Sequence, residues 1–195
     1  MHTTFEIEDQ QRARILRLRS EDGMNRLSRA TVLNLRDAVR QLSDDNRPLI
    51  ITGNEHFFSA GADLNEIASL TGHSAYEFAK TGQELMQVVA ELPAPVYAAI
   101  SGYCMGGGLD LALACHSRIG SPHAVFGHRG AALGLITGWG GTQRLPRLVG
   151  KARALEMFVA AEKIRSDQAL RIGLIDGIAD DPVAEALRQG SNQRG

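Results

Sequence analysis

The sequence GYCMGGGLD at residues 102–110 decides the fold. Its three consecutive glycines open an apolar segment that predicts a helix over residues 109–115. Each glycine costs a helix roughly 0.5–1 kcal/mol relative to alanine, so we expect a role that offsets this cost. One such role is a backbone N–H, as at Gly107, that faces a developing oxyanion and that a carbonyl can approach closely. Close packing of the helix on a strand is the structural alternative.

Asp110 stands in the otherwise apolar sequence GLDLALAC at residues 108–115. A carboxylate in such a segment is paired, capped by first-turn amides or functional. It follows Gly107 by three residues and is therefore expected at the same end of the helix as the proposed donor. Burial raises the pKa of a carboxyl and a helix N-terminus lowers it, so the sequence leaves the direction open. A helix-capping aspartate is the structural alternative.

A second segment, FSAGADL at residues 58–64, has related properties. Gly61 can adopt a φ that other residues avoid, which turns the next amide outward. Asp63 is a candidate N-cap for a short helix that begins at Leu64. The amide of Ala62 would then lie beside a helix N-terminus, which favours negative charge. A tight strand-to-helix turn without a ligand is the alternative.

Outward from these segments, strands alternate with helices, which predicts an α/β class. Strands are expected at residues 5–7, 13–19, 48–52, 96–100 and 124–127. Helices are expected at residues 28–42 (capped by Ser28), 74–91, 109–115, 152–161 and 166–171. Residues 57–63 are expected to form a loop, residues 101–108 a glycine turn, residues 138–150 a glycine-rich turn leading into a short helix, and the last ten residues or so a frayed tail. No linker divides the chain, so we expect one domain.

The composition excludes several classes. The chain has 195 residues, 21 Lys plus Arg and 22 Asp plus Glu, for a net charge of −1, which favours neither nucleic acid nor a membrane as a partner. No apolar run approaches a membrane span and the N-terminus lacks the pattern of a secretion signal. Cys104 and Cys115 suggest no disulfide framework, so we expect a cytoplasmic protein. The glycine spacing fits neither common nucleotide-binding loop, and we predict no metal site.

Together the two segments resemble the crotonase superfamily, also called the enoyl-CoA hydratase/isomerase family. The resemblance covers about residues 25–179, and its motifs occur in the family's order. They are NRL at residues 25–27, FSAGADL at 58–64, GYCMGGGLD at 102–110, FG at 126–127, GGTQRLPRLVG at 140–150 and GLI at 173–175.

The resemblance implies a single domain built as a spiral of ββα units, with acyl-CoA thioesters as substrates and assembly into homotrimers or hexamers. It implies no cofactor other than the coenzyme A carried by the substrate. By motif position, the amides of Ala62 and Gly107 would hold the thioester oxygen and stabilise an enolate, with Asp110 as the acid/base. Substrate-binding positions are implied at Ala60, Asp63, Leu64, Gly106, Gly130 and Trp139.

Two positions depart from the family's hydratases, which use two glutamates. Asp110 occupies the first position and is shorter by one methylene, about 1.5 Å. Gly130 occupies the second and carries no side chain. Because water addition needs both activation of water and delivery of a proton, efficient hydration is in question. His128 or Arg129 could contribute, although a structural histidine is the alternative. Trp139 either lines the acyl pocket or packs in the core.

The C-terminal region is also shorter than the resemblance implies. Family members continue through helices that cover the acyl pocket and help to close the CoA site. We therefore assign residues 1–180 to the acyl-CoA-binding domain and residues 181–195 to a short tail. The sequence EDG at residues 21–23 replaces a basic residue that the family often has there. We expect a CoA site that is weaker, more open or completed by a neighbouring subunit.

The first hypothesis is an acyl-CoA enzyme, with hydration of a 2-enoyl-CoA as the default reaction. Double-bond isomerisation is the alternative, since one carboxylate can move one proton between two carbons; hydrolysis and decarboxylation use the same scaffold. A second hypothesis is a family member without catalysis that binds acyl-CoA or only assembles with partners. A nucleotide-binding α/β protein is a distant third.

Overall fold

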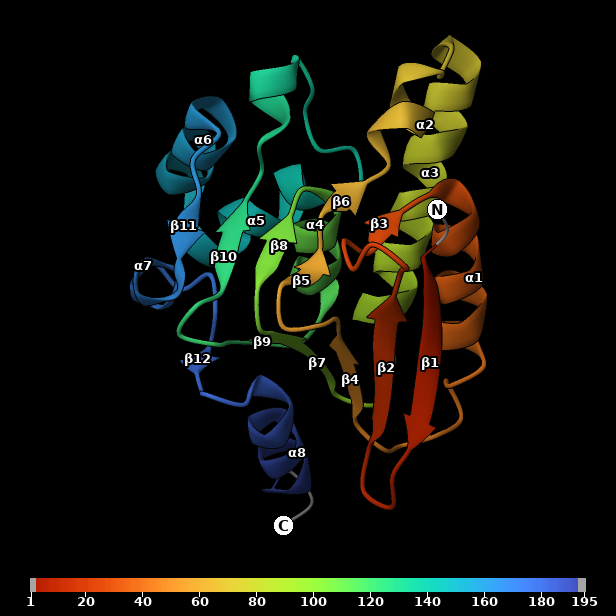
Figure 1. The fold of residues 1–195 in the computed structure, drawn as a ribbon, viewed down its shortest axis with the longest axis vertical. Helices are drawn as coiled ribbons and strands as arrows, with labels where there is room; N and C mark the ends of the chain where they lie inside the picture. The colour runs from red at the N-terminus through yellow and green to blue at the C-terminus, as the bar shows by residue number, and fades with distance from the viewer. Residues whose placement is uncertain (1–2, 193–195) are drawn as a thin grey trace.

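A computed structural model describes residues 3–192 of the protein (Figure 1). Its largest sheet has six strands, and every neighbouring pair is parallel except the antiparallel first pair, β1 and β2. In spatial order the strands are β1 (Thr4–Asp9), β2 (Arg14–Arg19), β4 (Leu49–Thr52), β7 (Val96–Ile100), β9 (Ser117–Gly120) and β12 (Gly177–Ile178). Parallel neighbours require crossover connections, and these connections build the site.

Two smaller sheets lie in those crossovers. One has the order β11 (Ile164–Arg165), β10 (Val125–Gly127), β8 (Tyr103–Met105), β5 (Phe57–Ser59), and the other pairs β3 (Arg26–Leu27) with β6 (Gly61–Ala62). After β4, β7 and β9, which belong to the large sheet, the next strand along the chain is β5, β8 or β10 of the four-stranded sheet. This repeated step confirms the predicted spiral of strand pairs and helices in a single α/β domain.

Helices follow most turns of the spiral. They are α1 (Arg29–Arg40), α2 (Leu64–Ala68), α3 (Gly72–Ala90), α4 (Gly107–Ala114), α5 (Gly141–Val149), α6 (Lys151–Ala160), α7 (Ser166–Arg171) and α8 (Pro182–Asn192), with a short 3₁₀ helix η1 (Gly130–Leu133). The predicted cap of α1 is confirmed, because the Ser28 side chain accepts a hydrogen bond from the Thr31 amide. Helices α1 and α3 pack against each other at one side of the molecule (Figure 1).

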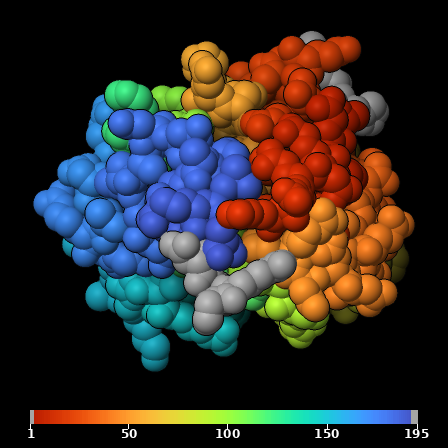
Figure 2. All heavy atoms as spheres, turned by 90° about the horizontal axis from the view of Figure 1, so that it is seen from below, coloured from red at the N-terminus to blue at the C-terminus, as the bar shows by residue number. Residues whose placement is uncertain are grey.

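The prediction of a frayed tail over the last ten residues or so is wrong up to residue 192, because helix α8 extends over Pro182–Asn192. This helix covers one face of the large sheet, where a second apolar cluster contains Ile15, Ile50, Tyr97 and Ala186. Figure 2 shows the C-terminal helix in blue beside the N-terminal strands in red. The helix is stable because it buries its apolar side on the sheet. Residues 193–195 of the predicted tail lie outside the described part of the chain.

Two predicted irregular segments also contain regular structure. The expected loop at residues 57–63 holds strands β5 and β6, and the expected glycine turn at residues 101–108 holds β8. Helix α4 begins at Gly107, two residues before the predicted start. These strands have two or three residues each and are stabilised by pairing with neighbours distant in sequence, which no local pattern reveals.

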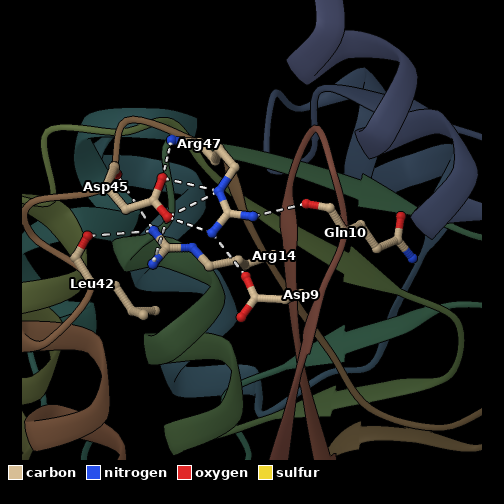
Figure 3. Close-up of polar contacts among 6 residues, drawn as sticks. All are labelled: Asp9, Gln10, Arg14, Leu42, Asp45 and Arg47. Atoms are coloured by element: carbon tan, nitrogen blue, oxygen red, sulfur yellow. Dashed lines mark hydrogen bonds and ion pairs between the residues drawn. The ribbon is translucent and has the colours of Figure 1, made fainter.

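A charged cluster joins the β1–β2 hairpin to the segment after α1 (Figure 3). The Arg14 side chain is buried, and its guanidinium lies 3.4 Å from Oδ2 of Asp45. Arg47 binds the same carboxylate through Nε at 2.9 Å and reaches Asp9 through Nη2 at 2.8 Å. Asp45 thereby compensates the buried charge of Arg14, which would otherwise destabilise the fold.

Two further observations concern the chain as a whole. Cys104 and Cys115 are buried free thiols, in agreement with the prediction that they form no disulfide framework. Within residues 3–192, no helix combines the length and apolarity needed to cross a membrane.

Candidate active site

Two tight bends bring the amides of Ala62 and Gly107 together. Gly61 has φ +98°, and Gly106, the N-cap of α4, has φ +50°, both in the region that favours glycine. A Cβ placed on Gly61 would lie 3.1 Å from the Gly107 nitrogen, and one placed on Gly107 would lie 3.3 Å from the Ala62 nitrogen. The Gly107 N–H also belongs to a first helical turn, whose N–H groups lack an intrahelical acceptor. The two nitrogens therefore lie close together.

Each of the three consecutive positions 106–108 requires glycine for a different reason. Gly106 supplies the positive φ that starts the helix. Gly107 leaves room for the Trp139 ring, whose Cζ3 would lie 2.4 Å from an added Cβ. Gly108 packs on β5, where an added Cβ would lie 2.7 Å from the Cβ of Ser59. Close packing, the structural alternative, therefore explains the third glycine but not the first.

A cavity of about 520 Å³ opens beside these amides. Its walls include apolar side chains from α2, α3 and the segment after η1, among them Ile67, Phe78 and Ile136. Most of the predicted site residues line it, namely Ala60, Ala62, Leu64, Gly106, Gly107, Asp110, Gly130 and Trp139. Asp63 does not line the cavity; its carboxylate instead caps α2 by accepting a hydrogen bond from the Asn65 amide at 2.9 Å.

Asp110 lies in the first turn of α4 and is 1% exposed. Its Oδ2 accepts a hydrogen bond from the Thr137 hydroxyl, and its Oδ1 lies 3.5 Å from Nε2 of His128. Within the described chain, neither Oδ1 nor Nε2 has a hydrogen-bond partner. The carboxyl group thus faces a hydroxyl on one side and an imidazole on the other, in the wall of an apolar cavity.

Burial decides the question that the sequence left open about this carboxyl. Desolvation raises the pKa of Asp110 to about 7, against smaller lowering effects from the Thr137 hydroxyl, the Arg144 charge and the Trp139 and Gly141 backbone. Burial also lowers the pKa of His128 to about 4. At neutral pH His128 is therefore uncharged and Asp110 has both of its forms available, which suits a general acid/base.

The sequence analysis did not identify three residues around Asp110. Thr137 supplies the hydroxyl, Arg144 on α5 supplies a nearby positive charge, and Gly141 leaves space for the carboxylate. A Cβ on Gly141 would lie 2.2 Å from Oδ1 of Asp110. Gly141 and Arg144 were visible only as part of the GGTQRLPRLVG motif.

Trp139 both packs in the core and lines the cavity. It is 3% exposed, and its ring lies against Phe78 with the ring centroids 5.2 Å apart. A Cβ on Gly82 of α3 would lie 2.1 Å from its Cδ1, so the indole is held between Gly82 and Gly107. Core packing of Trp139 is therefore confirmed, and its role in an acyl pocket stays a prediction.

The remaining candidates lie in the wall near η1. Gly130 begins η1 and lines the cavity, so the position of the family's second glutamate contributes only backbone there. Arg129 also lines the cavity but is exposed, whereas His128 is buried next to Asp110. Of the two predicted contributors, only His128 lies in contact range of the carboxyl.

Comparisons with known proteins agree with this fold. Residues 9–191 match the family model described as enoyl-CoA hydratase/isomerase. A crotonyl-CoA hydratase of Syntrophomonas wolfei is 38% identical over 175 residues, which are 88% of this chain and 67% of that protein.

Solved structures give the same result. An enoyl-CoA hydratase from Bacillus anthracis is 33% identical, with a TM-score of 0.90 over 96% of this chain and 75% of its own. One from Thermoplasma volcanium is also 33% identical, with a TM-score of 0.91 over 97% of this chain and 76% of its own. This chain therefore belongs to the enoyl-CoA hydratase/isomerase family, the crotonase superfamily.

Proposed function

We propose that the protein is an acyl-CoA enzyme that stabilises a thioester enolate and adds water to a 2-enoyl-CoA. One observation carries the proposal: a buried carboxyl with a pKa of about 7 lines the same cavity as two neighbouring backbone amides. The 38% identity to a crotonyl-CoA hydratase supports hydration and a short acyl chain.

In the proposed reaction, the amides of Ala62 and Gly107 donate hydrogen bonds to the thioester oxygen. Ionised Asp110 takes a proton from water while the water oxygen bonds to Cβ of the substrate. The electrons of the double bond move towards the thioester oxygen, which forms the enolate. The enolate then takes the proton from Asp110 at Cα, and the carboxylate is restored. Each amide donor contributes roughly 3–4 kcal/mol of transition-state stabilisation.

Isomerisation of a 3-enoyl-CoA is the second candidate. It is favoured by Gly130, which leaves Asp110 without the second carboxylate of the family's hydratases. One carboxylate suffices for isomerisation, because it removes a proton from one carbon and returns it to another. A third candidate, binding of acyl-CoA without catalysis, is opposed by the tuned pKa of Asp110.

We further propose that the protein acts in the cytoplasm as a homotrimer or hexamer, with no cofactor beyond the coenzyme A of its substrate. Leu155 and Val159 on α6 are 63% and 70% exposed, and large apolar side chains on a surface are typical of subunit interfaces. The assembly would complete the CoA site if a neighbouring subunit covers the open side of the cavity.

The test is incubation with crotonyl-CoA and, separately, a 3-enoyl-CoA in deuterated water, with products followed by mass spectrometry. Hydration adds the mass of water, whereas isomerisation moves the double bond. Asp110→Asn should abolish the reaction and preserve acyl-CoA binding measured by calorimetry. Asp180→Asn, a matched change at an exposed aspartate, should retain full activity. If no acyl-CoA changes with the unmodified protein, the catalytic proposal is wrong.

A further inference from the structure

Both oxygens of the Asp110 carboxyl face side chains that can donate or accept a hydrogen bond. The Thr137 hydroxyl contacts Oδ2, and Nε2 of His128 lies 3.5 Å from Oδ1. The residues Asp110 and His128 are 1% and 3% exposed. Oδ1 and Nε2 each lack a hydrogen-bond partner in the described chain, although the Trp139 and Gly141 backbone also acts on the carboxyl and lowers its pKa. His128 is therefore the side chain beside Oδ1 that can both donate and accept.

The chemistry of these partners matters because Asp110 is the only carboxyl proposed to act as both acid and base. An arginine or a backbone N–H can only donate, so it favours the ionised carboxylate. A neutral imidazole presents either a lone pair or an N–H at Nε2, depending on its tautomer. It can therefore accept from a protonated carboxyl and donate to an ionised one. A buried structural histidine would instead be expected to bond to a fixed group.

We propose that His128 is a positioning residue that holds Oδ1 of Asp110 in both protonation states, so that one carboxyl serves as acid and as base. In the acid form, Oδ1–H donates to the Nε2 lone pair; in the base form, Nε2–H donates to ionised Oδ1. His128 stays neutral in both forms and changes tautomer, because the proton gained at Nε2 is matched by one that Nδ1 releases to water. The structural part stands by itself, whereas its kinetic consequence rests on the proposed function.

The groups around Asp110 and His128 act on the protonation of Asp110 in opposite directions, so both of its forms occur near neutral pH. Arg144 on α5, the Thr137 hydroxyl and the Trp139 and Gly141 backbone all favour the ionised form of Asp110, which burial opposes. The nearby Cys104 thiol on β8 stays neutral because burial raises its pKa. On α6 the ring of Phe158 lies against the imidazole, with the ring centroids 5.3 Å apart.

The first test is nuclear magnetic resonance of protein labelled with ¹⁵N-histidine, titrated from pH 5 to 9. The His128 signal is identified by its loss in His128→Gln. Since burial holds the pKa of the imidazole at about 4, a change of its nitrogen shifts near pH 7 reports the carboxyl beside it. We expect this change in the unmodified protein and its disappearance in Asp110→Asn. His116, whose Nδ1 accepts from the Val96 amide at 2.9 Å, is the internal control, because its signals should behave alike in the unmodified protein and in Asp110→Asn.

The second test compares His128→Leu, which removes the polar contact, with His128→Gln, which keeps a side chain able to donate and accept. His128→Leu should lower kcat about 30-fold or more with KM little changed, and should move the pH–rate profile to higher pH. His128→Gln should restore most of kcat and the original profile. His123→Gln, at an exposed histidine, is the matched control and should behave as the unmodified protein.

The inference is overturned if Asp110→Asn leaves the His128 titration unchanged, or if His128→Leu keeps both kcat and its pH profile. The titration needs no substrate and no His128→Leu protein, so it decides the inference even if that variant does not fold. If no acyl-CoA is converted by the unmodified protein but the titration behaves as expected, the proposed function fails and the pairing stands.

Discussion

A methyl group on Gly141 would lie 2.2 Å from Oδ1 of Asp110 and 3.0 Å from Nε2 of His128. Glycine at position 141 therefore gives the carboxyl and the imidazole the space in which they face each other. Gly141 is the first residue of α5 and its φ lies outside the left-handed region, so the reason for glycine is space and not backbone conformation.

Gly141→Ala should displace the Asp110 carboxyl. Whichever reaction the unmodified protein catalyses, we expect its kcat to fall about 100-fold, because misplacing a catalytic group by about 1 Å has that effect. The free energy of unfolding should fall by about 1–3 kcal/mol because the added methyl group overpacks the site. Gly72→Ala is the matched control, since Gly72 is the first residue of α3 and has open space around it. It should leave kcat unchanged and be neutral or stabilising. Equal effects of the two changes would contradict the spatial explanation.

The raised pKa of Asp110 predicts a pH-dependent stability. Between about pH 4 and pH 7 the folded protein keeps a proton on this carboxyl that the unfolded chain has lost, so the free energy of unfolding falls as pH rises. Asp110→Asn removes this effect. The gain in unfolding free energy from this substitution should be larger at pH 8 than at pH 4.5 by on the order of 1–4 kcal/mol. Urea unfolding at both pH values measures it, and Asp180→Asn should keep the pH dependence of the unmodified protein.

Asn25 should be important for the stability of the strand that leads to Ala62. It is fully buried with φ +52°, and its Nδ2 donates to the carbonyls of Phe57 and Phe58 at 3.1 and 3.2 Å. Asn25→Ala loses these bonds and strains the backbone, so we expect a loss of about 2–4 kcal/mol in chemical unfolding. Asn25→Gly keeps the backbone conformation and should lose only about 1–2 kcal/mol. If glycine is as destabilising as alanine, the positive φ is not a source of strain.

The charged cluster of Figure 3 predicts a local acid sensitivity. Hydrogen bonds from Arg47 are the main cause that lowers the pKa of Asp45 to about 2. The stability that this carboxylate contributes is thus complete above about pH 4 and is lost as pH falls towards 2. Asp45→Ala should lower the unfolding free energy at pH 7 by about 1–3 kcal/mol, because buried Arg14 loses its counter-charge. Asp44→Ala, next to it and exposed, should change stability by less than about 0.5 kcal/mol.

The sequence was a good guide to elements with strong local patterns. Helix α1, with its Ser28 cap, and the buried strand β4 lie where periodicity and composition place them. It failed for β6 and β8, because strands of only two or three residues exist only through their partners. Helix α8 was detectable from Val183, Ala186 and Leu187, whose spacing forms one apolar face, but the polar end of the chain obscured this signal.

The site was predictable in part. Asp110 stood out because a single carboxylate interrupts an apolar segment, and the two amide positions followed from their glycines. Thr137 and Gly141 meet Asp110 only through the folding of α5 against α4, about thirty residues along the chain. The direction of the pKa shift depended on how completely these elements exclude water, which is a property of the packed structure.

The position of Trp139 gives the molecule an intrinsic optical reporter. It is the only tryptophan of the chain, and its indole is wedged between Gly82 and Gly107 in the wall of the cavity. A carbonyl bound at the Gly107 amide would lie beside that indole and change the polarity of its surroundings. Fluorescence emission should therefore follow occupancy of the cavity directly, with no dye or label attached.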